Sequence, residues 1–406
     1  MRILVISQYF WPENFRINDL VQDLIDRGHE VTVLTGLPNY PSGKVFSDFR
    51  KKPEMFSKFS GAKIVRVPLI TRGNGGFRLV LNYLTFALSA SLVGFFRLRK
   101  SSFDVIFVCQ LSPVTVGIPA VVFRSLKRIP VVFWVLDLWP ETLSALGYRS
   151  KIILKLVGGL VSFIYNRCDL ILGQSKGFIK NINKYCSQPQ KFRYFPSWSE
   201  TLFSEKSTVL APEVQEKSKV FNIVFTGNIG QSQDFPTILD AVELLKPHKD
   251  IRWLVVGDGR DADWVKKEIF KRGLSGSVEM LGRYPLDRMP SFISHADVLL
   301  VTLKKEPAFS LTIPGKVQSY LASGIPIVGM LDGEGARVIS ESQAGFVCPA
   351  GDSHGLANLI LEMKSLTKVE RERLGKNGKS YTEREFNRSK LINQLENWFD
   401  EVVAQE

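Results

Sequence analysis

Short apolar runs of strand length alternate with segments of helical periodicity along almost the whole chain, and this alternation limits the choice of fold. Residues 2–7 (RILVIS) form the first run, residues 18–28 carry apolar side chains at helical spacing, and residues 29–35 form the second run. Continuous apolar runs of this kind are typical of parallel strands that are covered on both faces. The pattern therefore predicts a doubly wound α/β domain. Further runs of the same kind lie at 103–109, 130–136 and 168–175.

The alternation lapses once and then starts again. Residues 199–219 are polar and charged, which is typical of a linker. We therefore expect a first Rossmann-like domain at 1–198, a second at 220–381, and a charged amphipathic helix at 382–406 that packs back on the first domain. Two domains of this class predict a ligand cleft outside the carboxyl ends of their strands. The apolar runs of the second domain lie at 221–228, 251–259, 277–281, 296–303 and 326–330.

The excess of basic over acidic residues lies wholly in the first half of the chain. Residues 1–200 hold 27 Lys and Arg against 12 Asp and Glu, a surplus of +15, whereas the remaining 206 residues have a balance of −2. Such asymmetry predicts a face that meets anions: nucleic acid, a phosphorylated substrate or an anionic membrane surface. A nucleic-acid-binding protein is disfavoured, because the basic residues do not form runs interleaved with aromatic residues. The four cysteines are widely separated, which favours a reducing compartment over a disulfide framework.

An uncharged apolar segment, residues 79–96, lies between basic flanks. Its 18 residues would span about 27 Å as a helix, which is short for a bilayer core of about 30 Å. The segment is either a buried helix of the domain or a helix that lies in the membrane interface with its flanks on lipid phosphates. A transmembrane span is the least expected. Residues 151–167 are a second candidate for the same surface. The flanking cations are Arg72, Arg78, Arg97, Arg99 and Lys100.

Asp137 follows directly after the buried run at 130–136. A carboxylate at the end of a buried strand costs several kcal/mol unless it meets water, a partner or a substrate. The residues alone leave open whether Asp137 meets a substrate. A helix cap or a partnered structural acid is the alternative.

Two loops follow the first two strands. Residues 11–16 present Glu13 and Arg16, and the loop after the second strand presents Asn39 and Tyr40. Loops at the carboxyl ends of parallel strands border the ligand site, so we expect both loops to contact a ligand. The alternative is that turn chemistry alone explains their prolines and glycines.

Glycine-containing turns and one lysine follow strands of the second half. Gly227 and Gly230 allow the backbone to approach a phosphate closely, and Gly257 follows the next strand. Lys316 stands at a predicted helix start beside Pro314, where its ammonium group can meet a diphosphate. The alternatives are bare glycine turns and a solvated lysine. A third glycine and a ribose-binding acid are missing, which disfavours a dinucleotide-dependent oxidoreductase.

The chain resembles a known family over nearly its whole length. TGN at 226–228, VVGDG at 255–259 and IPGKVQSYLASGIPIV at 313–328 are similar to the family 4 retaining glycosyltransferases of the two-domain GT-B fold. SQYFWPENFRINDL at 7–20 and DLWPE at 137–141 resemble the branch found in bacterial O-antigen and capsule clusters, and within it the N-acetyl-fucosamine-type transferases. The resemblance implies a nucleotide-sugar donor on the second domain, an acceptor on the first, and no required metal.

The resemblance also implies roles for residues at matching positions. It makes Asp137 the residue that positions a substrate hydroxyl, with Lys316 and Glu306 as the other catalytic candidates. It implies donor contacts at two loops and near the base, through Gly227, Asn228, Gly230, Gln231, Gly257, Arg283, Ser310, Leu311, Thr312, Pro314 and Ser319. It implies acceptor contacts through Arg16, Asn39, Tyr40 and Glu141.

The chain departs from the family pattern in two ways, each at a pair of positions. Leu311 and Ser319 stand where many members carry a pair of glutamates, the second of which holds ribose. Asn228 and Asp234 stand where many members carry an arginine and a lysine that neutralise the diphosphate. We therefore assign the phosphate role to Lys316, Arg283 and the backbone amides of residues 228–231.

These observations predict a retaining glycosyltransferase of O-antigen or capsule biosynthesis. It would move an N-acetylated hexosamine, with a 6-deoxy sugar as one option, from a UDP-sugar to a lipid-diphosphate-linked oligosaccharide. The expected partners are that donor, that acceptor and the anionic inner-membrane surface, with no nucleic acid and no cofactor or metal. We expect a monotopic protein on the inner face of the bacterial cytoplasmic membrane. The alternative is a UDP-sugar epimerase or hydrolase of the same fold.

Overall fold

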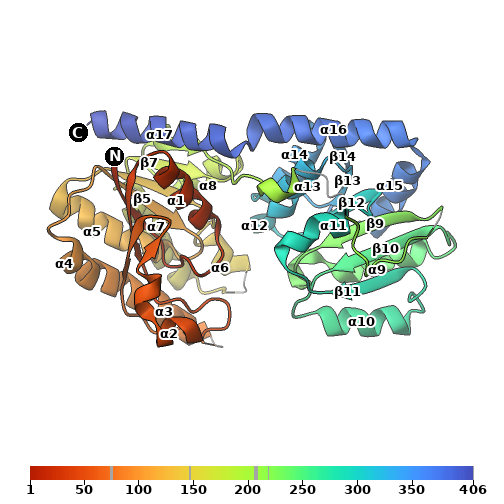
Figure 1. The fold of residues 1–406 in the computed structure, drawn as a ribbon, viewed down its shortest axis with the longest axis horizontal. Coiled ribbons are helices and arrows are strands. Elements are labelled where there is room, and N and C mark those ends of the chain that lie inside the picture. Colours follow the sequence, from red (N-terminus) through yellow and green to blue (C-terminus); the bar gives the residue numbers. More distant parts are fainter. Residues whose placement is uncertain (74–75, 146–147, 205–208, 218, 406) are drawn as a thin grey trace. The chain divides into compact units, whose positions relative to one another are not determined.

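The computed structural model describes residues 1–73, 76–145, 148–204, 209–217 and 219–405. The chain forms two compact units: unit 1 comprises residues 1–196 and 389–406, and unit 2 comprises residues 197–388 (Figure 1). Each unit is an α/β structure around one sheet of mostly parallel strands. The predicted fold class is therefore confirmed.

Unit 1 is built on an eight-stranded sheet with the order β3-β4-β2-β1-β5-β6-β7-β8. Each neighbouring pair is parallel except the edge pair of β3 and β4. The order reverses at β1 and β5, and ligands of doubly wound sheets bind at the carboxyl ends of such a pair. The strands are β1 (Arg2–Ile6), β2 (Glu30–Thr35), β3 (Lys58–Phe59), β4 (Ala62–Arg66), β5 (Val105–Gln110), β6 (Val131–Val135), β7 (Leu170–Gly173) and β8 (Phe192–Tyr194).

The helices of unit 1 pack on this sheet, and α5 contacts both α3 and α7. The helices are α1 (Arg16–Asp26), α2 (Ser47–Lys51), α3 (Gly76–Ser89), α4 (Phe95–Leu98), α5 (Gly117–Lys127), α6 (Glu141–Ala145), α7 (Lys151–Tyr165), α8 (Phe178–Tyr185) and α17 (Arg388–Ala404). Single 3₁₀ turns lie at Pro53–Phe56, Val114–Val116 and Pro189–Lys191.

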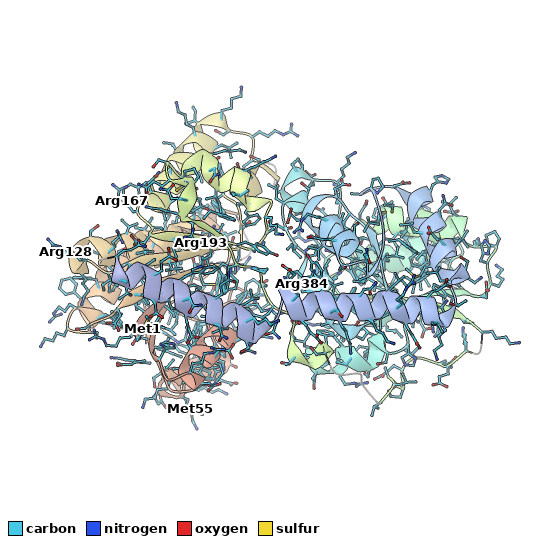
Figure 2. All side chains as sticks on the ribbon, turned by 90° about the horizontal axis from the view of Figure 1, so that it is seen from above. Met1, Met55, Arg128, Arg167, Arg193 and Arg384 are labelled. Carbon is cyan, nitrogen blue, oxygen red and sulfur yellow. The ribbon has the colours of Figure 1, made fainter. Side chains whose placement is uncertain are left out.

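The C-terminal helix α17 is tied to unit 1 by ion pairs. Glu396 lies 2.7 Å from both Arg27 Nη1 and His29 Nε2, at the end of α1 and just beyond it. Arg193 of β8 lies 3.2 Å from Glu401, and Figure 2 shows Arg193 beside this helix. Residues 389–406 therefore group with unit 1, although they follow unit 2 in sequence.

The apolar segment at 79–96 lies in a continuous helix, Gly76–Leu98, formed by α3, a π-helical turn at Ala90–Gly94 and α4. By length and composition this helix could cross a membrane, and 28% of its most apolar window is buried. Phe86 packs in the core, whereas an outward stripe is exposed. The stripe consists of Phe77, Val80, Leu84, Leu88, Leu92 and Phe96.

The π-helical turn keeps this stripe on one face of the helix. From Val80 onward the exposed residues recur every four positions, and an α-helix of 3.6 residues per turn would rotate such a series steadily round its axis. A π turn closes its hydrogen bonds over one more residue, so it rotates the series back. The alternative of a fully buried helix therefore does not hold for this face, because its large apolar side chains are 47–78% exposed.

Unit 2 contains a six-stranded parallel sheet with the order β11-β10-β9-β12-β13-β14. Its order reverses between β9 and β12, which places the expected ligand crevice at the carboxyl ends of these two strands. The strands are β9 (Phe221–Thr226), β10 (Ile251–Val256), β11 (Val278–Gly282), β12 (Val298–Thr302), β13 (Ile327–Met330) and β14 (Gly345–Cys348).

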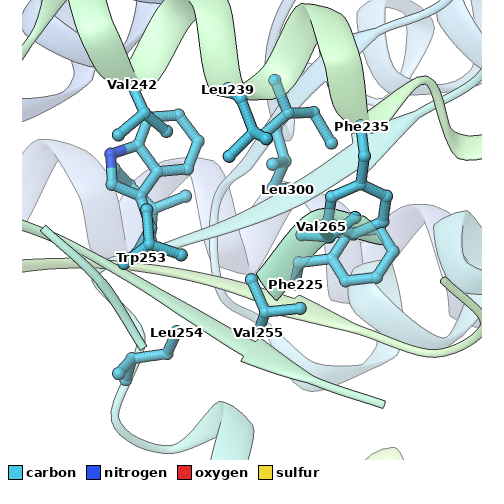
Figure 3. Close-up of a pocket in the computed structure, with 12 residues that line it drawn as sticks. Phe225, Phe235, Leu239, Val242, Trp253, Leu254, Val255, Val265 and Leu300 are labelled. Carbon is cyan, nitrogen blue, oxygen red and sulfur yellow. The ribbon is translucent and has the colours of Figure 1, made fainter. Parts of the chain in front are cut away.

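Helices cover both faces of the unit 2 sheet. They are α9 (Phe235–Leu244), α10 (Ala262–Lys271), α11 (Met289–Ile293), α12 (Pro307–Ser310), α13 (Gly315–Ser323), α14 (Gly333–Glu341), α15 (Ser353–Ser365) and α16 (Lys368–Glu385), with 3₁₀ turns at Thr201–Phe203, Gln231–Gln233 and Leu286–Arg288. In Figure 3, Leu239 and Val242 of α9 pack over the strand residue Trp253. The cavity there measures about 10 Å³, about the space of one water, so it is core rather than a ligand site.

The expected linker at 199–219 is instead part of unit 2. Phe203, Ala211 and Val214 are buried in its core, so their burial overrides the polar composition of the segment. Residues 205–208 and 218 of this segment lie outside the described residues. The helix expected at 382–406 is likewise two helices, because α16 ends at Glu385 in unit 2 and α17 begins at Arg388.

Candidate functional site

At the carboxyl edge of the unit 2 sheet, two glycine turns touch through their backbones. Gly227 and Gly257 have φ angles of 125° and 153°, a region that L side chains rarely adopt. The Gly227 N–H donates to Val256 O at 2.8 Å. A Cβ atom on Gly257 would overlap the carbonyl oxygen of Gly227. These positions therefore require glycine, and they leave the backbone open to a close ligand.

Lys316 lies in the first turn of α13, beside the Gly227 turn. Its Nζ donates to Gln233 Oε1 at 2.8 Å and lies 3.6 Å from the centre of the Phe225 ring. A Cβ atom on Gly227 would lie 2.8 Å from Lys316 Cε. Burial of the ammonium group lowers the pKa of Lys316 to about 7. An anion bound at the glycine turn would favour the protonated form.

The other predicted donor-binding residues differ in exposure and in the local hydrogen bonds that they form. Asn228, Gln231 and Arg283 are exposed, and Glu306 precedes the short helix α12. The hydroxyls of Ser310 and Thr312 donate locally, to Pro307 O at 2.8 Å and Phe309 O at 3.0 Å. Leu311 and Pro314 are half-buried in the same loop, Gly230 is buried, and Asp234 bonds Thr237.

The sequence interpretation missed a carboxylate, that of Glu200, which lies against α13. Ser319 Oγ donates to Glu200 Oε2 at 2.7 Å, and Gln318 Nε2 donates to Ser197 O at 2.7 Å. The segment after Ser197 therefore runs along α13 and brings an acid to Ser319, the position at which many family members carry a glutamate. Its contact could not be read from sequence, because Glu200 lies 119 positions before its partner.

Asp137 lies just beyond β6, at the carboxyl edge of the unit 1 sheet. It accepts hydrogen bonds from Trp139 Nε1 at 3.1 Å and from the hydroxyls of Thr142 and Ser112. Burial raises the pKa of Asp137 above its usual range, and these hydrogen bonds oppose that shift. Asp137 is thus a partnered acid that remains partly exposed. The alternative of a partnered acid is therefore borne out, and a contact between Asp137 and substrate stays a prediction.

Two buried glutamines lie at the carboxyl ends of β1 and β5, and one of them contacts the backbone of Asp137. Gln110 Nε2 donates to Asp137 O at 2.8 Å, and Gln8 Nε2 donates to Asn82 Oδ1 at 2.7 Å. Neither glutamine Oε1 atom has a hydrogen-bond partner among the described residues. The Nε2 atoms bond only to acceptors, so the amide orientations are fixed and the two oxygens are left to accept from hydroxyls. Tyr83 lies nearby, with its hydroxyl bonded to Ser112.

The two loops of unit 1 hold their shape through their own side chains. Glu13 is buried and accepts from the N–H groups of Phe10, Asn39 and Tyr40 at 3.2, 2.8 and 2.7 Å. Burial raises the pKa of Glu13 to about 7. Asn39 is fully buried and bonds to Leu37 O and the Arg72 N–H. The expectation that Glu13 and Asn39 face a ligand is therefore wrong in this structure, because both side chains serve the loop.

The remaining acceptor candidates differ in how they are placed. Tyr40 is exposed, with the guanidinium of Arg72 4.9 Å from its ring centre. Arg16 lies 3.5 Å from Asp19, one turn along α1. Glu141 Oε1 accepts from Tyr185 at 3.2 Å, so this carboxylate packs towards α8. Of the four predicted acceptor residues, Tyr40 is the one whose side chain is exposed on a loop that follows a strand.

Two family models match the chain. Residues 15–198 match Glycosyltransferase Family 4, and residues 220–365 match Glycosyl transferases group 1. The chain is 30% identical over 266 residues to "Probable glycosyltransferase WbjE" of Pseudomonas aeruginosa, covering 61% of this chain and 65% of that protein. The chain thus spans slightly less than two thirds of that relative.

Two further proteins are similar over more of their length. The chain is 23% identical to "Putative colanic acid biosynthesis glycosyl transferase WcaI" of Escherichia coli K12, covering 80% of this chain and 82% of that protein. The crystal structure of Anabaena HepE in complex with UDP has a TM-score of 0.70 at 15% identity, covering 99% of this chain and all of that one. This last likeness shows the shared GT-B fold.

Proposed function

We propose, from the premise that the chain belongs to the family 4 and group 1 glycosyltransferases, that it transfers a sugar from UDP to a lipid-linked saccharide. The observation that carries the proposal is the ammonium group of Lys316 beside the Gly227 turn. A cation at a backbone turn without side chains suits a diphosphate. The UDP complex of the structural neighbour supports the choice of nucleotide.

The proposed reaction assigns one role to Lys316 of unit 2 and another to Asp137 of unit 1. The bond between the sugar C1 and the diphosphate oxygen breaks, and UDP leaves with the electron pair. The acceptor oxygen bonds to C1, and its proton passes to the departing diphosphate. Lys316 stabilises the charge that develops on that diphosphate. Asp137 orients a substrate hydroxyl, and family resemblance supports retention at C1.

We assign the ribose to Glu200. Ser319 is too short to replace the glutamate of other members, and its hydroxyl donates to the Glu200 carboxylate. A carboxylate accepts from both hydroxyls of a ribose diol. The donor sugar is an N-acetylated hexosamine and the pathway that of O-antigen or capsule, as supported by the resemblance and by the colanic acid relative.

The acceptor lipid is consistent with a membrane-bound enzyme. The exposed stripe on α3 and α4 would enter the interface of the inner leaflet, and the basic surplus of residues 1–200 would meet its anionic lipids. An exposed apolar surface of this extent is rare on a soluble monomer. We therefore propose a monotopic position on the cytoplasmic face of the bacterial inner membrane.

The test is UDP release by the purified full chain in detergent. Each UDP-N-acetylhexosamine is supplied with and without a lipid-diphosphate-linked sugar. Release should depend on the acceptor, and Asp137→Asn should lower it about 100-fold because the hydroxyl loses its alignment. Asp48→Asn, an exposed acid of unit 1, is the matched control.

Two outcomes contradict the proposal. Conversion of the donor without acceptor would support the UDP-sugar epimerase or hydrolase. Unchanged transfer by Asp137→Asn would reduce Asp137 to a structural acid, since its bonds to Trp139 and Thr142 would then be its whole role.

A further inference from the structure

Three arginines surround a hollow on unit 1, away from the carboxyl edge of its sheet. Arg124 and Ser125 belong to the last turns of α5, Arg128 follows that helix, and Arg167 lies two residues after α7. Together these four residues line a hollow of about 510 Å³. It lies at the end of unit 1 where β6 and β7 begin, so it is separate from Asp137 and the glutamines. Figure 2 shows Arg128 and Arg167 on the same side of unit 1.

The positive charge of this hollow is only partly compensated. Arg124 pairs with Asp169, whose Oδ2 also accepts from the Val131 N–H at 2.7 Å. Arg128 and Arg167 are exposed, and neither forms an ion pair with a described residue. One carboxylate therefore faces three guanidinium groups. The excess charge favours an anion, and the planar donors of arginine suit phosphate oxygens.

Exposed apolar side chains adjoin two of the residues that line the hollow. The guanidinium of Arg167 lies 3.8 Å from the centre of the Phe163 ring, and Nη1 donates to Phe163 O at 3.1 Å. Phe163 is 43% exposed, and Leu126, next to Ser125, is 61% exposed. A ligand that only supplied phosphate would gain nothing from these side chains. A ligand with phosphate and hydrocarbon in one molecule would contact both.

The outer face of α7 leads directly to Arg167. Ile152, Leu156 and Phe163 are exposed at helical spacing, and Arg167 continues this series one turn further. The α7 stripe and the stripe on α3 and α4 belong to helices that both contact α5. Exposed apolar residues on one face of α7 thus precede Arg167, which lies in the turn after the helix, in the order expected where acyl chains meet headgroups.

We propose that Arg124, Arg128 and Arg167 form a binding site for the phosphate headgroup of an anionic phospholipid. The inference rests on the membrane position proposed above and adds a defined headgroup site to it. Arg128 and Arg167 supply the uncompensated charge, Arg124 is held in place by Asp169, and Leu126 and Phe163 enter the interface.

The test measures binding of the full chain to vesicles of phosphatidylcholine with or without phosphatidylglycerol, by flotation. Arg128→Gln with Arg167→Gln should weaken binding to the phosphatidylglycerol vesicles about 30-fold, at about fivefold for each arginine near an anionic surface. Binding to phosphatidylcholine alone should not change. Arg50→Gln with Lys51→Gln removes the same charge from exposed positions on α2 and should cost less than threefold.

A second pair of substitutions tests the membrane position independently of the headgroup site. Leu84→Glu with Leu88→Glu alters the exposed stripe and leaves the buried Phe86 intact, and it should weaken binding to both vesicles. If the Leu84/Leu88 variant binds both vesicles as the wild type does, the proposed membrane position is wrong. The headgroup site is tested separately, by whether the Arg128/Arg167 variant loses the part of the binding that depends on phosphatidylglycerol. Arg167→Gln alone serves if the double variant unfolds, as judged by thermal melting.

Three results would overturn the headgroup site. The first is equal loss in the Arg128/Arg167 and Arg50/Lys51 variants, which would mean diffuse charge. The second is saturable binding of inorganic phosphate that is lost in the Arg128/Arg167 variant while binding to the phosphatidylglycerol vesicles is unchanged, which would mean a free-anion site. The third is an RNA affinity that falls with the same two arginines while vesicle binding is unchanged.

Discussion

The carboxyl edges of the two sheets hold their loops in different ways. In unit 2, the turns at Gly227 and Gly257 touch through backbone atoms, and Lys316 lies beside the Gly227 turn. In unit 1, side chains hold the loops: Glu13 accepts three backbone N–H groups, and Gln110 bonds the backbone of the Asp137 loop. Donor binding should therefore depend on backbone geometry, whereas acceptor recognition should depend on individual side chains.

Of the substitutions that test this difference, Gly257→Ala should have the largest effect on stability and on UDP binding. The added Cβ atom would overlap the Gly227 carbonyl at a φ of 153°, so the two turns must separate. We expect the free energy of unfolding to fall by about 3 kcal/mol and UDP binding to be lost. Thermal melting and calorimetric titration with UDP measure the two effects.

Gly276→Ala is the matched control, because a Cβ atom there meets no atom within 4 Å. It should leave both the melting temperature and UDP affinity within error of the wild type. UDP binding that survives Gly257→Ala would show that the backbone contact is not what shapes the donor site.

Lys316→Met should lower UDP affinity about 10- to 100-fold, because a charge-assisted bond to the diphosphate is lost. Lys304→Met removes an exposed cation from the loop after β12 and should change affinity less than threefold. Equal losses in the two variants would mean that general charge, rather than the ammonium group beside Gly227, attracts the diphosphate.

The pH dependence of Lys316 gives a second readout. Its pKa is about 7 in the folded chain and about 10.4 in an unfolded one. The unfolded chain therefore holds the proton more tightly, and the free energy of unfolding contributed by Lys316 rises as the pH rises from about 7 to about 10. UDP favours the protonated lysine, so its affinity should fall over the same interval. Lys316→Arg, which stays charged, should remove both trends.

The sequence could predict those features that depend on neighbouring residues. Continuous apolar runs predicted the central strands of both sheets, because strands covered on both faces must be apolar throughout. Lys316 was predicted at a helix start, and the structure places it beside Gly227. Short strands such as β3 and β8 lack such runs, since they lie at the sheet edges and are partly exposed.

The direction of a side chain within a loop could not be predicted. Asn39 and Tyr40 are adjacent, yet Asn39 is fully buried and Tyr40 is exposed, because the Asn39 amide bonds two backbone groups of its own and a neighbouring loop. The polar composition of 199–219 likewise predicted a linker, although its residues Phe203, Ala211 and Val214 are buried in the core of unit 2. Long-range contacts decided both cases.

Glu200→Gln should have the smallest effect, a five- to tenfold loss of UDP affinity, because one charged hydrogen bond to the ribose becomes a neutral one. The carboxylate lies 2.7 Å from Ser319 Oγ, so Ser319→Ala should alter affinity less than Glu200→Gln does. The decisive comparison uses 2′,3′-dideoxy-UDP. The wild type should bind it more weakly than UDP, whereas Glu200→Gln should bind the two nucleotides almost equally. If the variant still discriminates as well as the wild type, the ribose is held elsewhere and Glu200 only fixes α13.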